Sequence, residues 1–149
     1  MNGDDYAGLL IAQRIAGLGL AGTDVAFFSG DLSSMIETWA GYDTVLICDA
    51  AISEKPAGTV RSINAKSGPL PREISFVSTH AFGLADTIEL ARTLGKLPPE
   101  LCVYAVEAVN LGLGAPITRE VEMAVERLVK QIQDGGKPDH PGEAIKLMN

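Results

Sequence analysis

Apolar residues in this chain form two kinds of pattern that follow one another along the sequence. Continuous apolar runs are typical of strands covered by helices on both faces, and they occur at residues 25–28, 45–48 and 101–106. Stripes spaced at three and four residues are typical of amphipathic helices, and they occur at residues 4–18, 32–39, 80–94 and 118–132. The alternation predicts an α/β fold, a three-layer α/β/α sandwich around a mostly parallel, twisted sheet.

The run at residues 45–48 predicts the central strand, and it leads directly into Asp49. In open α/β sheets, ligands bind beyond the carboxyl ends of the strands, so an acid that ends this strand is a candidate functional group. Asp is also common in the turn after a strand, where its side chain caps the backbone. Both interpretations of Asp49 stay open on the sequence pattern alone.

Shorter segments complete the predicted sheet. A strand, a helix and a strand within residues 24–51 form a βαβ unit, whose two strands should be parallel. Residues 59–64 are less apolar and predict an edge strand, and residues 74–77 predict a short one. We expect one domain at residues 1–134, followed at residues 135–149 by a flexible tail rich in Gly, Pro and charge.

Residues 17–22 match the Gly-x-Gly-x-x-Gly pattern of dinucleotide-binding proteins. That pattern has to follow a strand and open a helix. Here the glycines follow a predicted helix and precede a predicted strand, so they indicate a helix end and a loop. A flavodoxin-like nucleotide binder is disfavoured as well, because no glycine loop that could hold a phosphate follows a strand.

Composition narrows the class of protein. With 149 residues, 46% of them hydrophobic, the chain is long enough for one domain with a buried core. Its net charge of −7 argues against nucleic acid or an anionic membrane as the main partner. We expect neither a membrane span nor a signal peptide. Two cysteines, Cys48 and Cys102, are too few for a disulfide framework and favour the cytoplasm.

Three chemically capable side chains stand at comparable places in the predicted fold. Asp5 lies at the start of the first helix, Asp49 at the end of the central strand, and His80 at the start of the third helix. Such positions meet at one edge of a doubly wound sheet. Two carboxylates and an imidazole there would suit a borderline divalent metal such as Ni²⁺ or Zn²⁺, and they could equally form an acid–base set. Asp5 and His80 also have structural explanations, a helix dipole and a hydrogen bond at a helix start.

Nucleophilic catalysis fits the sequence less well. Ser78 has no Gly-x-Ser-x-Gly elbow around it. Cys48 precedes Asp49 in the predicted strand, so Cys48 faces the core if Asp49 faces the site. A Cys–His pair with His80 is therefore disfavoured.

Four short motifs follow one another along the chain. They are GDDYAG at residues 3–8, LICDA at residues 46–50, PAGTV at residues 56–60 and STHAFGLAD at residues 78–86. In order and spacing, they resemble the successive motifs of the [NiFe]-hydrogenase maturation proteases. Glu107 and residues 112–120 resemble that family's last strand, loop and helix start, so the resemblance extends from residue 3 to about residue 132.

The resemblance implies a cytoplasmic endopeptidase that removes the C-terminal extension from the precursor of a hydrogenase large subunit after nickel insertion. It places the family's metal-binding and catalytic side chains on Asp5, Asp49 and His80. The implied metal is nickel carried by the precursor, with another divalent metal as an alternative in its place. That metal would polarise the scissile carbonyl or a water molecule, or a carboxylate would serve as the base, as in an acid protease.

The start of the sequence departs from the family. Relatives begin with an apolar strand inside the sheet and a Gly-x-Gly-Asn turn, whereas this sequence begins with Met1-Asn2-Gly3. Each buried apolar side chain of such a strand is worth about 1.5–3 kcal/mol, so their sum rivals the whole stability of a domain, about 5–15 kcal/mol. We therefore expect about ten further residues upstream. The alternative is an inactive copy or a non-catalytic binding module that recognises the precursor or the metal without cleavage.

Overall fold

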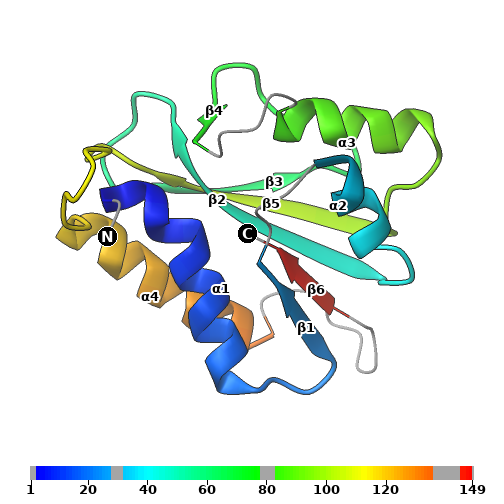
Figure 1. Cartoon of the computed structure of the whole chain (residues 1–149), viewed down its shortest axis with the longest axis horizontal. Helices are drawn as coiled ribbons and strands as arrows, with labels where there is room; N and C mark the ends of the chain where they lie inside the picture. Colours follow the sequence, from blue (N-terminus) through cyan, green and yellow to red (C-terminus); the bar gives the residue numbers. More distant parts are fainter. Residues whose placement is uncertain (1–2, 28–31, 78–82, 136–144, 149) are drawn as a thin grey trace.

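A central sheet lies between two layers of helices in the computed structural model of the chain (Figure 1). The structure describes residues 3–27, 32–77, 83–135 and 145–148. The helical segments are η1 (Gly3–Tyr6, a 3-10 turn), α1 (Ala7–Leu18), α2 (Leu32–Thr38), α3 (Leu84–Thr93) and α4 (Arg119–Gln133). The strands are β1 (Thr23–Ala26), β2 (Thr44–Ile52), β3 (Val60–Asn64), β4 (Ser75–Phe76), β5 (Glu100–Glu107) and β6 (Ile145–Met148).

The sheet has the order β1-β6-β2-β5-β3, and β4 pairs with β2 outside this path. Strands β1, β6, β2 and β5 are parallel to one another, whereas β3 and β4 are antiparallel to their neighbours. The prediction of a three-layer α/β/α fold with a mostly parallel sheet is confirmed. Strand β3 pairs with β5 alone among the described strands, so it is an edge strand, as its lower apolar content predicts.

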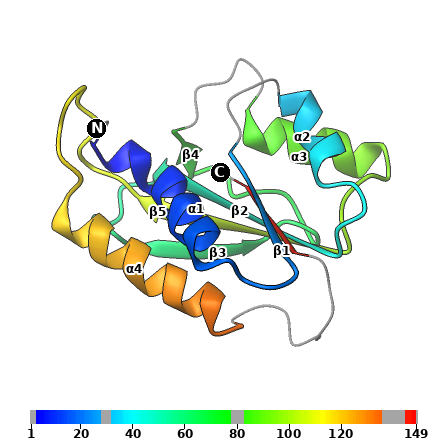
Figure 2. The ribbon, with the colours of Figure 1, turned by 60° about the horizontal axis from the view of Figure 1, so that its bottom comes forward.

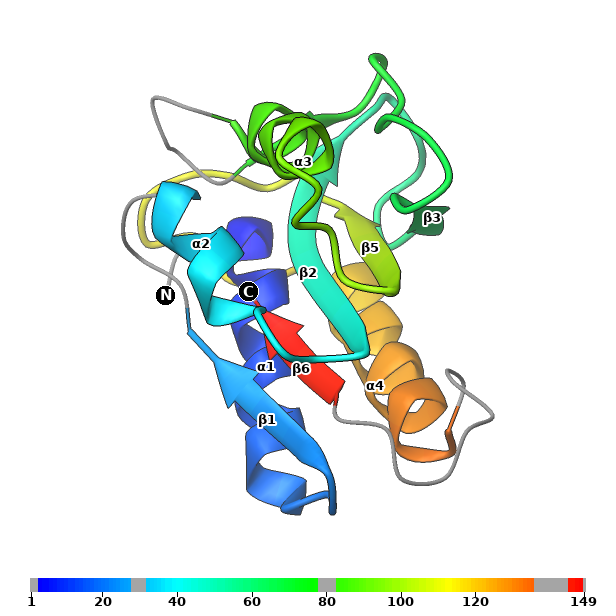
Figure 3. The ribbon, with the colours of Figure 1, turned by 90° about the vertical axis from the view of Figure 1, so that its right-hand side faces the viewer.

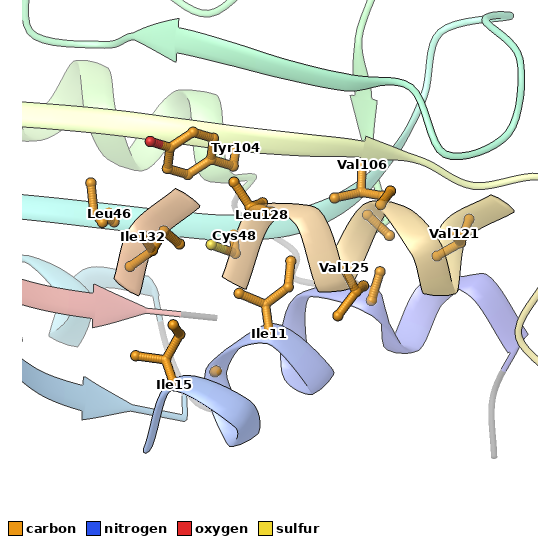
Figure 4. Close-up of a cluster of buried hydrophobic side chains, with 14 of the residues drawn as sticks. Ile11, Ile15, Leu46, Cys48, Tyr104, Val106, Val121, Val125, Leu128 and Ile132 are labelled. Carbon is orange, nitrogen blue, oxygen red and sulfur yellow. The ribbon is translucent and has the colours of Figure 1, made fainter. Parts of the chain in front are cut away.

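Strand β2 is buried on both faces because helices cover both. Leu46 and Cys48 point into the core that α1 and α4 form, and Figure 4 shows Cys48 near Leu128 and Leu46 near Ile132. Val45 and Ile47 point into the opposite core, which α2 and α3 form. A strand of this kind needs apolar residues at successive positions, which explains the continuous run at its start.

The last helix shows how the apolar stripes position the outer layers. One face of α4 is buried against the sheet and α1, and Figure 4 shows its apolar side chains Val121, Val125, Leu128 and Ile132. Burial of each such side chain stabilises the fold by about 1.5–3 kcal/mol. The helix begins where predicted, since the Thr118 side chain accepts a hydrogen bond from the backbone N–H of Val121 at 3.4 Å.

The glycine-rich segment at residues 17–22 is a helix end and a loop, as predicted. Helix α1 ends at Leu18, and Gly19 follows in the left-handed conformation, with φ of 59°. A glycine there ends the helix without the strain that a Cβ atom would introduce. Strand β1 begins four residues later, at Thr23, so these glycines do not open a helix as a dinucleotide site requires.

Two predicted boundaries were wrong, and both lie near the candidate site. Strand β2 does not end at Asp49 but continues to Ile52, because Ala51 pairs with Glu107 on one side and Phe76 on the other. Asp49 therefore lies inside the strand.

Helix α3 begins at Leu84, not near His80. Gly83 is its N-cap in an extended conformation, without a side-chain hydrogen bond, and the buried stripe starts at Leu84. Burial against the sheet therefore sets the start of this helix. The predicted caps Ser78 and Thr79, and His80 itself, lie outside the described residues.

The predicted flexible tail at residues 135–149 does not extend to residues 145–148, which form β6. This strand lies between β1 and β2 and is parallel to both, as Figure 3 shows. Strands β1 and β2 each present backbone N–H and C=O groups along one edge, and β6 between them forms hydrogen bonds with both edges. The sequence gives little sign of this, because the pairing is decided by partners more than 90 residues away. An interior position of this kind is where the family resemblance puts an apolar strand.

Within the described part of the chain, no helix is both long and apolar enough to cross a membrane.

Candidate active site

Asp49 lies near the carboxyl end of β2, with only 8% of its surface exposed. It lies two residues from both Ile47 and Ala51 along the strand, so its side chain is on their face of the sheet, the one that α2 and α3 cover. The chain passes close to it after β4, where the backbone N–H of Val77 donates to the carbonyl oxygen of Ala50 at 3.0 Å. His80 follows Val77 by three residues, but it lies outside the described residues.

Asp5 lies in η1, which contacts β2. Its side chain is partly buried, and its Oδ1 atom is fully enclosed without a hydrogen-bond partner among the residues that the structure describes. A buried carboxylate oxygen without a partner costs about 1–3 kcal/mol or more, so such atoms call for an explanation. A cation that binds this oxygen would supply one, and a carboxylate oxygen is a suitable ligand for a divalent metal.

The structure thus brings together the elements that carry two of the three predicted site residues. Asp5 and Asp49 come from η1 and β2, which pack against each other. No three His, Cys, Asp or Glu side chains within residues 3–27, 32–77, 83–135 and 145–148 come together as a metal-binding group. Since His80 is outside these ranges, the set of Asp5, Asp49 and His80 stays a prediction.

Asp4 is a buried anchor that the sequence pattern did not reveal. It is fully buried, and its carboxylate accepts hydrogen bonds from the backbone N–H groups of Val109, Asn110 and Thr118 at 3.0, 2.9 and 2.7 Å. Burial by itself would raise the pKa of Asp4, but these hydrogen bonds outweigh it and hold the pKa below its ordinary value.

Gly3 allows the same anchor to form. Its φ of +64° is in the left-handed region, and a Cβ atom at this position would collide with the carbonyl oxygen of Asn110. The backbone N–H of Gly3 donates to Ala115 at 2.9 Å, and the N–H of Asp4 donates to Asn110 at 2.8 Å. Figures 1 and 2 show η1 beside the loop that joins β5 to α4. The motif Gly-Asp-Asp therefore fixes the start of the chain to that loop.

Glu107 anchors a second loop at the carboxyl edge of the sheet. It is 4% exposed, and its carboxylate accepts hydrogen bonds from Ser53 N, Ser53 Oγ and Lys55 N at 2.8, 2.7 and 3.3 Å. Between them, Glu54 has a φ of 62°, which is uncommon for a residue with a side chain. The loop after β2 is thus held in one conformation by a carboxylate from β5.

Cys48 is unsuited to act as a nucleophile. Its side chain is fully buried in the core beneath α1 and α4, as Figure 4 shows. Burial raises the pKa of its thiol, and the neighbouring Cys102 and Asp49 raise it further. The prediction that Cys48 faces the core is confirmed.

The loop between β5 and α4 exposes apolar side chains next to η1. Val109 is 58% exposed, Leu111 is 39% exposed and Leu113 is 98% exposed. The loop is held at its base by Asp4 and by a hydrogen bond from the Asn110 side chain to the carbonyl oxygen of Pro116 at 3.0 Å. A loop fixed in this way presents its apolar side chains to solvent in a defined arrangement.

A pocket of about 530 Å³ lies at the opposite end of the sheet. It is bounded by the end of α2 and the loop before β5, and its lining includes Trp39, Tyr42 and Lys96. Neither Asp5 nor Asp49 lines it. Since enzymes of this fold place their chemistry at the carboxyl ends of the strands, the edge with Asp49 is the better candidate site.

Comparisons with known proteins agree with this fold. The family model described as hydrogenase maturation protease matches residues 21–134. The Hydrogenase 2 maturation protease of Escherichia coli (strain K12) is 26% identical over an alignment that covers 95% of this chain and 90% of that protein. The match to the family model begins after α1, so Asp5 lies outside it, whereas Asp49, His80 and Glu107 lie within it.

Solved structures share the architecture. The structure of the [NiFe] hydrogenase maturation protease HybD from Thermococcus kodakarensis has a TM-score of 0.70 at 23% identity, and the match covers 92% of this chain and 93% of that one. The endopeptidase HycI from Escherichia coli has a TM-score of 0.67 at 19% identity, over 97% and 89% of the two chains. These likenesses establish the fold.

Proposed function

This chain belongs to the hydrogenase maturation protease family, and on that basis we propose that it removes the C-terminal extension of a [NiFe]-hydrogenase large-subunit precursor after nickel insertion. A peptidase activity is common to the family. The observation that supports the proposal most strongly is the family match over residues 21–134, which spans β1 to the end of α4.

In this proposal, Asp5, Asp49 and His80 bind the nickel ion that the precursor carries. The buried Oδ1 atom of Asp5 has no hydrogen-bond partner in the part of the chain that the structure describes, and this supports the assignment because a cation would satisfy it. Two carboxylates and an imidazole are suitable ligands for nickel, and another divalent metal could take its place in the assay. The ion is part of the substrate, so cleavage would depend on its presence in the precursor.

The proposed reaction is hydrolysis of one peptide bond. The oxygen of a water molecule adds to the scissile carbonyl carbon, the C–N bond breaks, and the leaving nitrogen takes up a proton. The carboxylate of Asp5 or Asp49 would accept the proton of the attacking water, as in an acid protease. The bound ion would lower the barrier by polarising the carbonyl or the water.

The apolar loop between β5 and α4 is a candidate contact for the precursor. Val109, Leu111 and Leu113 belong to the loop that Asp4 anchors, so a peptide extending from the Asp5 side of the site would meet this loop. The net charge of −7 disfavours a nucleic-acid partner. Among the described residues, Cys48 and Cys102 are free cysteines, which fits a reducing cytoplasm as the place of action.

Incubation of the purified protein with nickel-loaded and nickel-free precursor tests the proposal. We expect the intact mass of the large subunit to fall by the mass of its extension only when the precursor carries nickel. An unchanged mass in both reactions would contradict the proposal. A stable complex without cleavage would instead support a binding module that recognises the precursor.

A further inference from the structure

Asp4 and Asp5 are adjacent acids with opposite surroundings. Both oxygen atoms of Asp4 accept backbone hydrogen bonds, whereas Oδ1 of Asp5 is buried without a partner among the described residues. The carboxylate of Asp4 is therefore occupied by hydrogen bonds within the fold, whereas that of Asp5 keeps an oxygen atom for a ligand. This contrast points to a role for Asp4 in holding Asp5 in place.

The hydrogen bonds of Asp4 reach far across the sequence. Its Oδ2 accepts from Val109 and Asn110, which directly follow β5, and its Oδ1 accepts from Thr118, which caps α4. Three donors from two ends of one loop thus converge on a single side chain. Hydrogen bonds to an ionised acceptor are stronger than those between neutral groups, so this link is firm.

The segment that carries Asp5 packs against β2 and continues directly into α1, but its own turn is short. η1 is a single 3-10 turn of four residues, and helices this short are not stable alone. The following helix begins without a side-chain cap, since Tyr6 makes no capping hydrogen bond. The backbone bonds of Gly3 and Asp4 and the carboxylate of Asp4 therefore hold this turn against the β5–α4 loop.

We propose that Asp4 is a positioning residue, which holds η1 on the β5–α4 loop so that the carboxylate of Asp5 meets the substrate's metal ion in a fixed orientation. The inference rests on the proposed function of Asp5. Groups that orient a metal ligand typically change metal affinity or activity by 10–100-fold when they are replaced. A displacement of about 1 Å at a reacting group has a comparable effect.

A merely structural Asp4 would stabilise the domain without any specific effect on Asp5. Asp4→Asn separates the two possibilities, because the amide is of equal size but its NH2 group cannot accept a hydrogen bond. Leu128→Ala is the matched control, since it removes a buried side chain of α4 and lowers stability without touching η1. The two variants are compared at equal fractions folded.

Two readouts are measured, the Ni²⁺ affinity of the metal-free protein by calorimetry and the cleavage rate of nickel-loaded precursor at saturating concentration. We expect Asp4→Asn to weaken Ni²⁺ binding and slow cleavage by about 10–100-fold, with Leu128→Ala close to wild type. In an Asp5→Asn background, Asp4→Asn should weaken Ni²⁺ binding no further, because Asp4 acts through Asp5. Equal behaviour of Asp4→Asn and Leu128→Ala, or an undiminished effect in the Asp5→Asn background, overturns the inference.

A second pair of variants keeps the test decisive if Asp4→Asn does not fold. Thr118→Pro removes the backbone N–H group that donates to Oδ1 of Asp4, and the φ of −70° at this position already suits proline. Thr118→Ala keeps that N–H group and loses only the side chain. We expect Thr118→Pro to weaken Ni²⁺ binding relative to Thr118→Ala, and equal affinities overturn the inference.

Failure of the proposed function is recognised separately. If the wild-type protein leaves nickel-loaded precursor intact, the proposed function fails and the Ni²⁺ titrations decide the inference alone. If it cleaves precursor but binds no free Ni²⁺, the cleavage rates decide. A wild-type protein that does neither overturns both.

Discussion

Individual carboxylates at this edge of the sheet differ in what they are used for. Asp4 and Glu107 are buried and accept backbone hydrogen bonds from loops, so they hold the frame of the site. Asp5 has a buried oxygen atom without a partner among the described residues. The ionised form of Asp4 is favoured by its three N–H donors, which gives the protein a specific dependence on pH.

Replacing Asp4 with Asn is expected to lower the free energy of unfolding at pH 7 by about 1–3 kcal/mol, since a buried N–H group loses its acceptor. The pKa of Asp4 is lower in the folded than in the unfolded chain, so its ionised form stabilises the fold above the ordinary pKa of 3.8. That contribution is lost as the pH falls through the lowered pKa of the folded state. Urea denaturation of both proteins at pH 7 and below pH 3.8 measures the difference.

The exposed Asp43, replaced by Asn, serves as the control for this experiment and should leave stability within about 0.5 kcal/mol of wild type. A difference between wild type and Asp4→Asn that persists or grows in acid would contradict the assignment.

At the residue scale, the sequence predicted which acids matter better than how they are held. Asp5 and Asp49 were identified because acids at a helix start and a strand end are placed where ligands bind. The buried hydrogen bonds of Asp4 could not be predicted, because its partners lie more than 100 residues away. Nor could the position of Asp49 inside β2, which depends on pairing with both β4 and β5.

The helices and strands were predictable where burial alone decides them. Helix α4 packs against one core and therefore has an apolar stripe along one face. Strand β2 lies between two cores and therefore has a continuous apolar run. Elements decided by distant pairing were missed, and β6 is the main example, since its two partners are β1 and β2. The start of α3 was missed because contact with the sheet, and not a capping residue, determines it.

Strand β6 is expected to hold β1 in the sheet, because β1 pairs with no other strand among those described. Leu147→Pro removes a backbone N–H group within β6 and should cost at least about 1–3 kcal/mol of stability. Leu147→Ala keeps that group and is the matched control. Hydrogen exchange should then be faster at residues 23–26 in the proline variant than in the alanine variant, and equal exchange would contradict the pairing of β6 with β1.

The loop after β2 depends in the same way on Glu107. The backbone N–H groups of Ser53 and Lys55 both donate to Oε1 of Glu107, and Glu107→Met removes this acceptor while keeping a side chain of similar length. We expect faster amide exchange at both residues and a loss of about 1–3 kcal/mol in the free energy of unfolding. Glu54→Gln, at an exposed acid of the same loop, should change neither quantity. Unchanged exchange at Ser53 in Glu107→Met would show that the loop is held by other contacts.

In the whole molecule, the two ends of the sheet differ, because the anchored loops gather at one end and the pocket near Trp39 lies at the other. The loops after β2 and β5, together with η1, gather at the carboxyl edge, where buried carboxylates hold each of them. The roomy pocket near Trp39 lies at the other end, without an acid from the predicted site. The two ends of β2 therefore offer a direct comparison, since Asp49 lies near its carboxyl end and Asp43 precedes its amino end.

The central claim is that the acids at the carboxyl edge act on the nickel-loaded precursor. The most direct measurement is the rate at which Asp49→Asn and Asp43→Asn remove the C-terminal extension, with folding of each variant verified by circular dichroism. We expect Asp49→Asn to cleave at least about 100-fold more slowly than wild type, as is typical when a group that acts in the transition state is lost, and Asp43→Asn to cleave at the wild-type rate. A folded Asp49→Asn variant that processes the precursor normally would contradict the claim.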